Sequence, residues 1–135
     1  MAASIKRFVV DASFVLASFL PDEESPEPDE VIRRHINGEI ELVSANIFEL
    51  EVFNGLRSAA LQKRITREDS LAIAENFLKL GIRCEPMDTY RAFLLAINGK
   101  LSVYDATYVC LAKTEGIKLL TLDRKMERLA KGKKN

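Results

Sequence analysis

Two aspartates directly follow apolar segments of the kind that form buried strands. Asp11 comes after Phe8-Val9-Val10, and Asp123 comes after Leu119-Leu120-Thr121-Leu122. A third aspartate, Asp105, stands where a helix is expected to begin. Ligands of open parallel sheets bind outside the carboxyl ends of the strands, so neighbouring strands would place these carboxylates on one rim. Crowded carboxylates repel one another unless a cation neutralises them, and oxygen ligands of this kind suit Mg²⁺ or Mn²⁺.

Each of these aspartates also has a simpler structural use. Aspartate is a preferred N-cap residue, and all three precede or begin an expected helix. Ser102 and Asp105 have the spacing of a capping box. Taken one at a time, capping is the more frequent role. The two roles are compatible, because a helix N-terminus keeps a carboxylate ionised and able to meet a cation.

A further acid lies on a long apolar helix expected over residues 46–61. At 100° per residue, its polar side chains form one narrow stripe: Glu51, Asn54, Gly55, Ser58 and Gln62. Most of the remaining helix surface is apolar, so the helix is expected to be largely buried. The stripe then faces either water or a polar cleft, and periodicity alone slightly favours water.

Short apolar segments alternate with helical patterns along the chain. The expected strands cover residues 8–10, 40–43, 82–85 and 117–123, the last being the clearest. The expected helices cover residues 12–20, 28–37, 46–61, 66–81, 89–98 and 102–115, with a short helix at the end. Strands separated by helices indicate parallel βαβ units. The sequence therefore predicts an α/β fold, a three-layer sandwich whose parallel sheet is flanked by helices.

Composition fits one globular domain over residues 1–135. Apolar residues make up 47% and charged residues 30% of the chain, a balance typical of folded rather than disordered proteins. No apolar run approaches the roughly 18 residues needed to cross a bilayer, and a cytoplasmic location is expected. Twenty basic and twenty acidic side chains cancel, so any binding of a polyanion must rest on a local patch.

Cysteine and histidine offer little for metal chemistry. Cys84 and Cys110 are isolated, and we expect free, semi-buried thiols. A zinc site is not expected, because His35 is the one histidine and no ligand set can be assembled around it. We interpret His35 as a surface residue.

Four segments carry a resemblance to PIN-domain proteins, close to the toxin nucleases of VapBC-type toxin–antitoxin pairs. The order and spacing of these segments match those of the family over nearly the whole chain. Each segment alone is weak evidence, but four in the same order are strong evidence. The segments are Phe8-Val-Val-Asp11-Ala-Ser13, Glu51-Val-Phe-Asn54-Gly-Leu56, Leu101-Ser-Val-Tyr-Asp105-Ala-Thr-Tyr-Val and Leu119-Leu-Thr121-Leu-Asp123-Arg. One departure is Ala45, since many relatives have proline six residues before the glutamate. It affects the entry into the helix and not the chemistry.

The resemblance implies a PIN-like fold and an acidic site. It assigns the catalytic positions to Asp11, Glu51, Asp105 and Asp123, with Asp11, Asp105 and Asp123 holding Mg²⁺ or Mn²⁺ directly or through water. Glu51 would ligate the ion or orient the attacking water. Three further residues match supporting positions: Ser13, Asn54 and Thr121. The implied reaction is hydrolysis of RNA that leaves a 5′-phosphate and a 3′-hydroxyl.

Contacts with RNA and with partner proteins are also implied. Basic residues form two regions, one at Arg57, Lys63, Arg64 and Arg67 and one at Arg124, Lys125 and Arg128. Arg124 is the better candidate for phosphate binding because it directly follows Asp123, although a scattered basic surface is more often only solvated. Tyr104 and Tyr108 flank Asp105, where packing is a more frequent role than base stacking. The resemblance also implies a homodimer and a small antitoxin that presents an arginine to the carboxylates.

Other functions remain open at this point. A phosphatase with an aspartyl nucleophile also has aspartate after its first strand, but it needs a second aspartate where this chain has Ser13. A phosphate-accepting signalling domain needs an acidic pair and a lysine that do not stand where required. An RNA-processing nuclease of the PIN kind, or a PIN-like module that only binds RNA or a partner, is the nearer alternative. The presence of all four acids argues against the inactive module.

Overall fold

Four parallel strands form the centre of the molecule. The computed structural model describes residues 4–132, and within them the strands are β1 (Lys6–Val10), β2 (Ile40–Ala45), β3 (Arg83–Glu85) and β4 (Leu119–Leu120). Their order in the sheet is β3-β2-β1-β4, with every pair parallel. The chain moves outward from β1 to β2 and β3, and then returns to add β4 on the other side of β1. The carboxyl ends of β1 and β4 therefore lie at the switch point where α/β sheets place their ligands.

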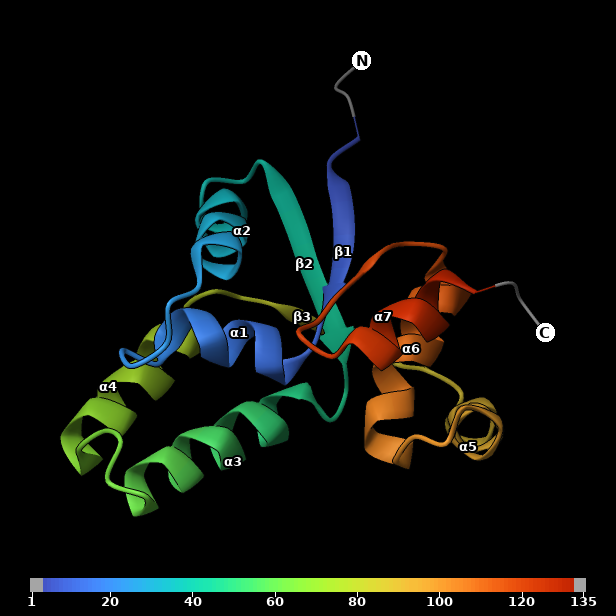
Figure 1. Cartoon of the computed structure of the whole chain (residues 1–135). Coiled ribbons are helices and arrows are strands. Elements are labelled where there is room, and N and C mark those ends of the chain that lie inside the picture. Colours follow the sequence, from blue (N-terminus) through green and yellow to red (C-terminus); the bar gives the residue numbers. More distant parts are fainter. Residues whose placement is uncertain (1–3, 133–135) are drawn as a thin grey trace.

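Helices cover both faces of this sheet. The helices before β3 are α1 (Ala12–Phe19), α2 (Pro26–Ile36), α3 (Phe48–Leu61) and α4 (Arg67–Leu78); those after it are α5 (Thr89–Gly99), α6 (Val103–Glu115) and α7 (Arg124–Lys131). Figure 1 shows α1 to α4 on one side of the sheet and α5 to α7 on the other. The predicted three-layer α/β sandwich is confirmed.

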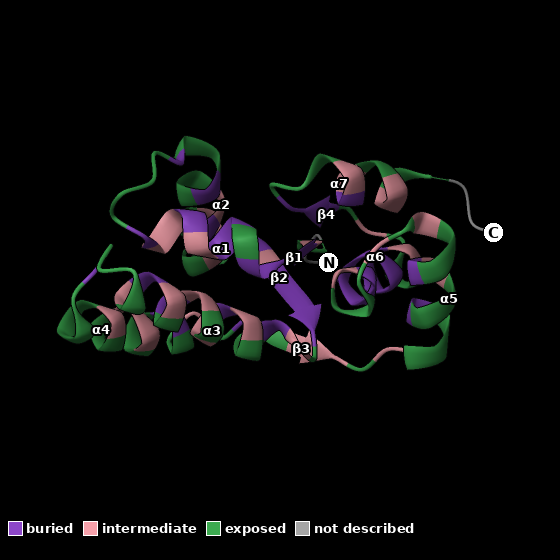
Figure 2. Cartoon of the chain, turned by 60° about the horizontal axis from the view of Figure 1, so that its bottom comes forward, coloured by how far each residue is buried: buried purple, intermediate pink, exposed green. Residues whose placement is uncertain are grey.

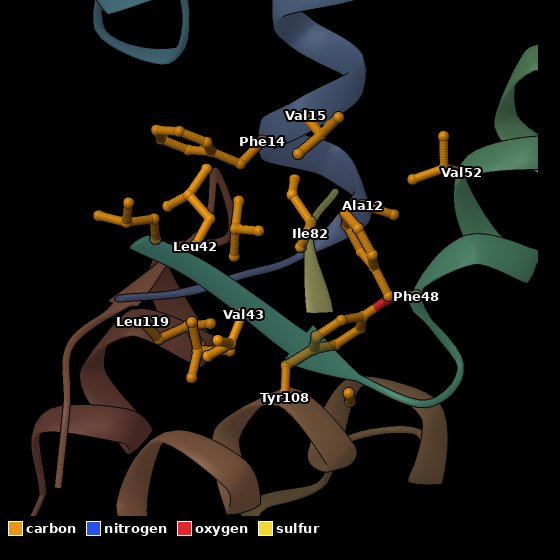
Figure 3. Close-up of a cluster of buried hydrophobic side chains, with 14 of the residues drawn as sticks. Ala12, Phe14, Val15, Leu42, Val43, Phe48, Val52, Ile82, Tyr108 and Leu119 are labelled. Atoms are coloured by element: carbon orange, nitrogen blue, oxygen red, sulfur yellow. The ribbon is translucent and has the colours of Figure 1, made fainter. Parts of the chain in front are cut away.

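The core lies on both faces of the two inner strands. Val9, Val10, Leu42 and Val43 have no exposed surface, because helices cover each face of β1 and β2. Figure 2 shows this burial as purple in the centre, with green on the outward faces of the helices. Figure 3 shows side chains from α1, α3 and α6 meeting around the strands, with Tyr108 among them.

Local signals in the sequence set several helix ends. The hydroxyl of Thr66 accepts a hydrogen bond from the Asp69 N–H at 2.9 Å, and Ser102 does the same for Asp105 at 3.0 Å. Gly116 ends α6 with φ of +66°, a left-handed conformation that glycine adopts at no steric cost. These three predicted boundaries are confirmed.

Other boundaries differ from the prediction. The segment 117–123 contributes only Leu119 and Leu120 to the sheet, because β4 is an edge strand that pairs with β1 at two positions. Helix α3 begins at Phe48 rather than residue 46, because β2 continues to Ala45, where it pairs with β3. Helix α2 begins at Pro26, two residues earlier than expected, with proline in its first turn.

The remaining predictions concern cysteine, histidine and membrane segments. Both cysteines are free, as predicted, and Cys84 is half-buried as expected, whereas Cys110 is buried. The prediction that His35 is only a surface residue is wrong. Its Nδ1 accepts from the Leu42 N–H at 3.1 Å, so Nε2 carries the proton and donates to the Leu80 carbonyl at 2.7 Å. Among residues 4–132, no helix has both the length and the hydropathy that a membrane crossing requires.

Candidate active site: an acidic rim at four helix starts

Asp11 is held at the carboxyl end of β1, directly beside β4. Its N–H donates to the Leu120 carbonyl at 3.2 Å, which continues the pairing of Val10 with Leu120. Only 4% of its surface is exposed. Strand β1, which leads directly into Asp11, and strand β4, which ends three residues before Asp123, are thus neighbours, as the acidic rim requires.

Three donors fix the Asp11 carboxylate. Oδ1 accepts from the Ser13 hydroxyl at 2.8 Å and from the Phe14 N–H at 3.0 Å, and Oδ2 accepts from the Thr121 hydroxyl. Ser13 Oγ also accepts from the Leu122 N–H at 3.4 Å. Both hydroxyls therefore bind the carboxylate from opposite sides and leave it a single orientation.

Asp123 is tied into the same network through Thr121. The Thr121 hydroxyl oxygen accepts from the Asp123 N–H at 3.0 Å, while Asp123 Oδ1 accepts from the Met126 N–H at 3.0 Å and caps α7. One buried threonine thus orients one aspartate through its side chain and another through its backbone. Asp123 itself is exposed.

Each of the four acids stands at the start of a helix. Asp11 and Asp123 are the N-caps of α1 and α7, and Glu51 and Asp105 lie in the first turns of α3 and α6. The capping interpretation is confirmed for Asp11 and Asp123, and it coexists with their place on the rim. The positive ends of the helix dipoles favour negative charge here.

Electrostatic repulsion shows that the carboxylates share one region. Burial raises the pKa of Asp11 above its ordinary value, the bonds from Thr121, Phe14 and Ser13 oppose this rise, and the charge of Asp105 adds to it. The pKa of Asp105 is also raised, first by burial and then by the charge of Asp123, against the lowering effect of Ser102. Asp105 therefore interacts electrostatically with both Asp11 and Asp123.

Glu51 joins this region through a residue that the sequence did not single out for chemistry. The Tyr108 hydroxyl donates to Glu51 Oε1 at 2.6 Å. The pKa of Tyr108 is raised far above its ordinary value, first by burial, then by the hydrogen bond and charge of Glu51, and then by the charge of Asp11. Tyr108 is packed as predicted. A buried tyrosine hydroxyl also needs a hydrogen-bond partner, and this requirement could have indicated from the sequence that Tyr108 contacts a polar residue.

The remaining predicted residues lie on the outside of the site. Asn54 is exposed on α3, almost one turn after Glu51, and Arg124 is exposed as the first residue of α7. In the other basic region, Arg64 is paired with Asp22 at 2.7 Å. Position alone therefore favours Arg124 for contact with a ligand of the acidic rim.

The acids of the rim have no positive partner in the part of the chain that the structure describes. None of the ion pairs between residues 4–132 includes Asp11, Glu51, Asp105 or Asp123. Within the same residues, no three acidic, histidine or cysteine side chains are close enough to form a ready metal site. The donor set consists of oxygen and carries excess negative charge, which fits a hard divalent cation that keeps several waters.

Comparison with known proteins identifies the family of the chain. The family model of the PIN domain matches residues 8–132. The chain belongs to the PIN-domain family. Membership decides against the aspartyl phosphatase and the signalling domain as alternatives.

Relatives within the PIN family are similar over most of their length. Ribonuclease VapC3 of Pyrobaculum aerophilum is 34% identical over 125 residues, which cover 89% of this chain and 92% of that protein. Ribonuclease VapC12 of Mycobacterium tuberculosis is 30% identical over 95 residues, covering 70% and 73%. The crystal structure of PAE2754 from Pyrobaculum aerophilum superposes with a TM-score of 0.73 at 22% identity, covering 92% of this chain and 79% of that one. That structural likeness supports the PIN fold.

Proposed function

We propose that this PIN-domain protein is a metal-dependent endoribonuclease that hydrolyses phosphodiester bonds of RNA. One observation carries the proposal: buried Asp11 and half-buried Asp105 repel each other at the switch point of the sheet, with no positive side chain of residues 4–132 paired to either. Such a group of acids is costly unless it binds a cation. The similarity to proteins named VapC ribonucleases supports RNA as the substrate.

Each residue of the rim then has a role in hydrolysis. Asp11, Asp105 and Asp123 would hold Mg²⁺ or Mn²⁺, directly or through water. When bound, the ion supplies Lewis-acid stabilisation of charge on the phosphodiester. Glu51 orients the attacking water on the side of the phosphorus opposite O3′. The new P–O bond forms as the P–O3′ bond breaks and O3′ takes up a proton, so the products carry a 5′-phosphate and a 3′-hydroxyl.

Residues around the acids support this chemistry. Ser13 and Thr121 hold Asp11 in its orientation through the hydrogen bonds described above. Asn54 extends the polar edge of α3 beyond Glu51. Arg124 binds a phosphate of the RNA, because it is exposed at the start of α7 beside Asp123.

The decisive experiment replaces Asp11 by asparagine. Asp11→Asn keeps an oxygen for Ser13 and Phe14 and removes the charge, so the fold is expected to remain while Mn²⁺-dependent cleavage of total RNA falls at least about a hundredfold. Asp88→Asn is the matched control, because Asp88 is likewise an aspartate N-cap, of α5. EDTA should abolish cleavage by the wild type. Equal rates for Asp11→Asn and the wild type would refute the assignment of Asp11. A wild type that cleaves no RNA would favour a module that only binds RNA.

The proposed setting is a toxin–antitoxin pair in the cytoplasm. We propose that the chain forms a homodimer and binds a small antitoxin whose arginine reaches the acidic rim, where it would form charge-assisted pairs. Large exposed apolar side chains on α5, including Tyr90 and Ile97, support contact with another chain. Light scattering of the purified protein tests the dimer, and a monomer at micromolar concentration would count against it.

A further inference from the structure

Tyr108 joins two helices that each carry an acid of the rim. It lies in α6, almost one turn after Asp105, and 1% of its surface is exposed. Its hydroxyl donates to Glu51 Oε1 at 2.6 Å, and Glu51 lies in α3, 57 residues earlier. The bond therefore connects a catalytic candidate of one layer of helices with the other layer.

Packing fixes the position of the tyrosine ring. Tyr108 belongs to the main hydrophobic cluster of the molecule, together with Phe48 and Val52 of α3. Figure 3 shows the ring rising from α6 toward Phe48, the first residue of α3. A ring held in a close-packed core cannot follow the movements of a glutamate. The glutamate instead takes the orientation that the hydroxyl offers.

Glu51 has little else to orient it. Its side chain is half-buried and has three rotatable torsions. Between residues 4–132, the Tyr108 hydroxyl is the one hydrogen-bond donor to its carboxylate, and no ion pair includes it. A phenol keeps its proton at neutral pH, so Tyr108 acts as a donor and occupies Oε1. The second oxygen, Oε2, is left to accept a hydrogen bond from another molecule.

We propose that Tyr108 is a positioning residue for RNA hydrolysis. Its hydroxyl fixes Glu51 in one orientation, so that Oε2 accepts a hydrogen bond from the attacking water. Tyr108 acts only through Glu51, because its buried ring lies beyond the reach of RNA. This role rests on the proposed ribonuclease function.

Tyr108→Phe tests the proposal, because it removes one oxygen and leaves the ring in the core. The substrate is the RNA that wild-type protein cleaves fastest in total RNA, measured under single-turnover conditions with Mn²⁺. We expect the cleavage rate at saturating enzyme to fall about ten- to hundredfold, because the variant loses a hydrogen bond to a charged group that must be correctly placed. The concentration for half-saturation should stay within about twofold. Thr107→Val is the control, because it also removes a buried hydroxyl from α6, one that donates to the Tyr104 carbonyl and not to an acid.

A second readout measures the position of Glu51 without using activity. The crystal structure of the metal-free wild type should show Glu51 in one conformer. The crystal structure of metal-free Tyr108→Phe should show Glu51 displaced or in several conformers. A lower rate with Glu51 in its wild-type place overturns the proposal, and so does an unchanged rate. If the wild type cleaves no RNA, the proposed function fails instead, and the crystal structures alone then decide whether Tyr108 fixes Glu51.

Discussion

Thr121→Val tests whether the acidic rim is held together by the hydroxyl between its aspartates. The substitution is nearly isosteric and removes the donor to Asp11 Oδ2 and the acceptor for the Asp123 N–H. Both Thr121 and Asp11 are buried, at 9% and 4% exposed. A hydrogen bond to a buried charged group contributes about 1.5–3 kcal/mol, so we expect the free energy of unfolding at pH 7 to fall by about 2 kcal/mol.

The loss should depend on pH, with a sign set by Asp11. Burial already raises the pKa of Asp11 in the folded protein, and the Thr121 bond opposes that rise. Removing Thr121 raises this pKa further. When folding raises the pKa of a carboxyl, the group contributes its full stability to the folded protein below the pKa that it has in the unfolded chain, about 3.9. That contribution is lost as the pH rises through the pKa of the folded protein. The variant should therefore lose more stability at pH 7 than below pH 3.9.

Urea unfolding in EDTA, followed by far-UV circular dichroism from pH 3 to 8, measures both quantities. With a slope of about 1.5 kcal/mol per M urea, a loss of about 2 kcal/mol lowers the midpoint at pH 7 by about 1.3 M. Thr107→Val is the control, because its buried hydroxyl donates to the backbone carbonyl of Tyr104 and not to an acid. Its effect should be the same at every pH. A loss for Thr121→Val below about 0.5 kcal/mol, or one that does not change with pH, would refute the reasoning.

Two further changes separate the acids from the basic residues. Asp105→Asn should raise the unfolding free energy of the metal-free protein at pH 7 by roughly 0.5 kcal/mol, a small gain because solvent screens a half-exposed group. The pKa of Asp105 is raised by burial and by the charge of Asp123, so this gain in stability should vanish below the ordinary aspartate pKa. Thermal unfolding at pH 7 and at a pH below that pKa checks both expectations. Arg124→Ala should weaken RNA binding and reduce the salt slope of log K by about 1 without changing the saturating cleavage rate. An equal effect of Arg67→Ala on the salt slope would show that the other basic region contacts the RNA as well.

Much of the rim could be predicted because its signals are local. Asp11 and Asp123 each follow an apolar strand, and both cap the next helix through a side-chain bond three residues along. Asp105 and Ser102 have the spacing that a helix start requires. These patterns depend on neighbours in sequence, so one sequence is enough to read them.

What could not be predicted depends on contacts distant in sequence. The sequence does not say that β4 lies beside β1, which follows from packing of α6 and α7 against that side of the sheet. The extent of β4 was overestimated, since the predicted strand of seven residues, 117–123, pairs at only two positions. Periodicity slightly favoured water around the stripe with Glu51, whereas this side chain is half-buried against Tyr108, 57 residues away.

The height of Glu51 relative to Asp11 follows from how closely α1 and α3 pack. Both helices start at the same rim of the sheet and run away from it together (Figure 1). Gly55 of α3 faces Leu16 of α1, and a Cβ at position 55 would overlap the Leu16 side chain. Asp11 precedes Leu16 by five residues and Glu51 precedes Gly55 by four, so close contact at this pair brings both acids to one level. The glycine has an α-helical backbone, and its value here is the space that it leaves rather than a special φ. Glu51 thus lies level with Asp11 because a residue without a side chain lets the two helices approach.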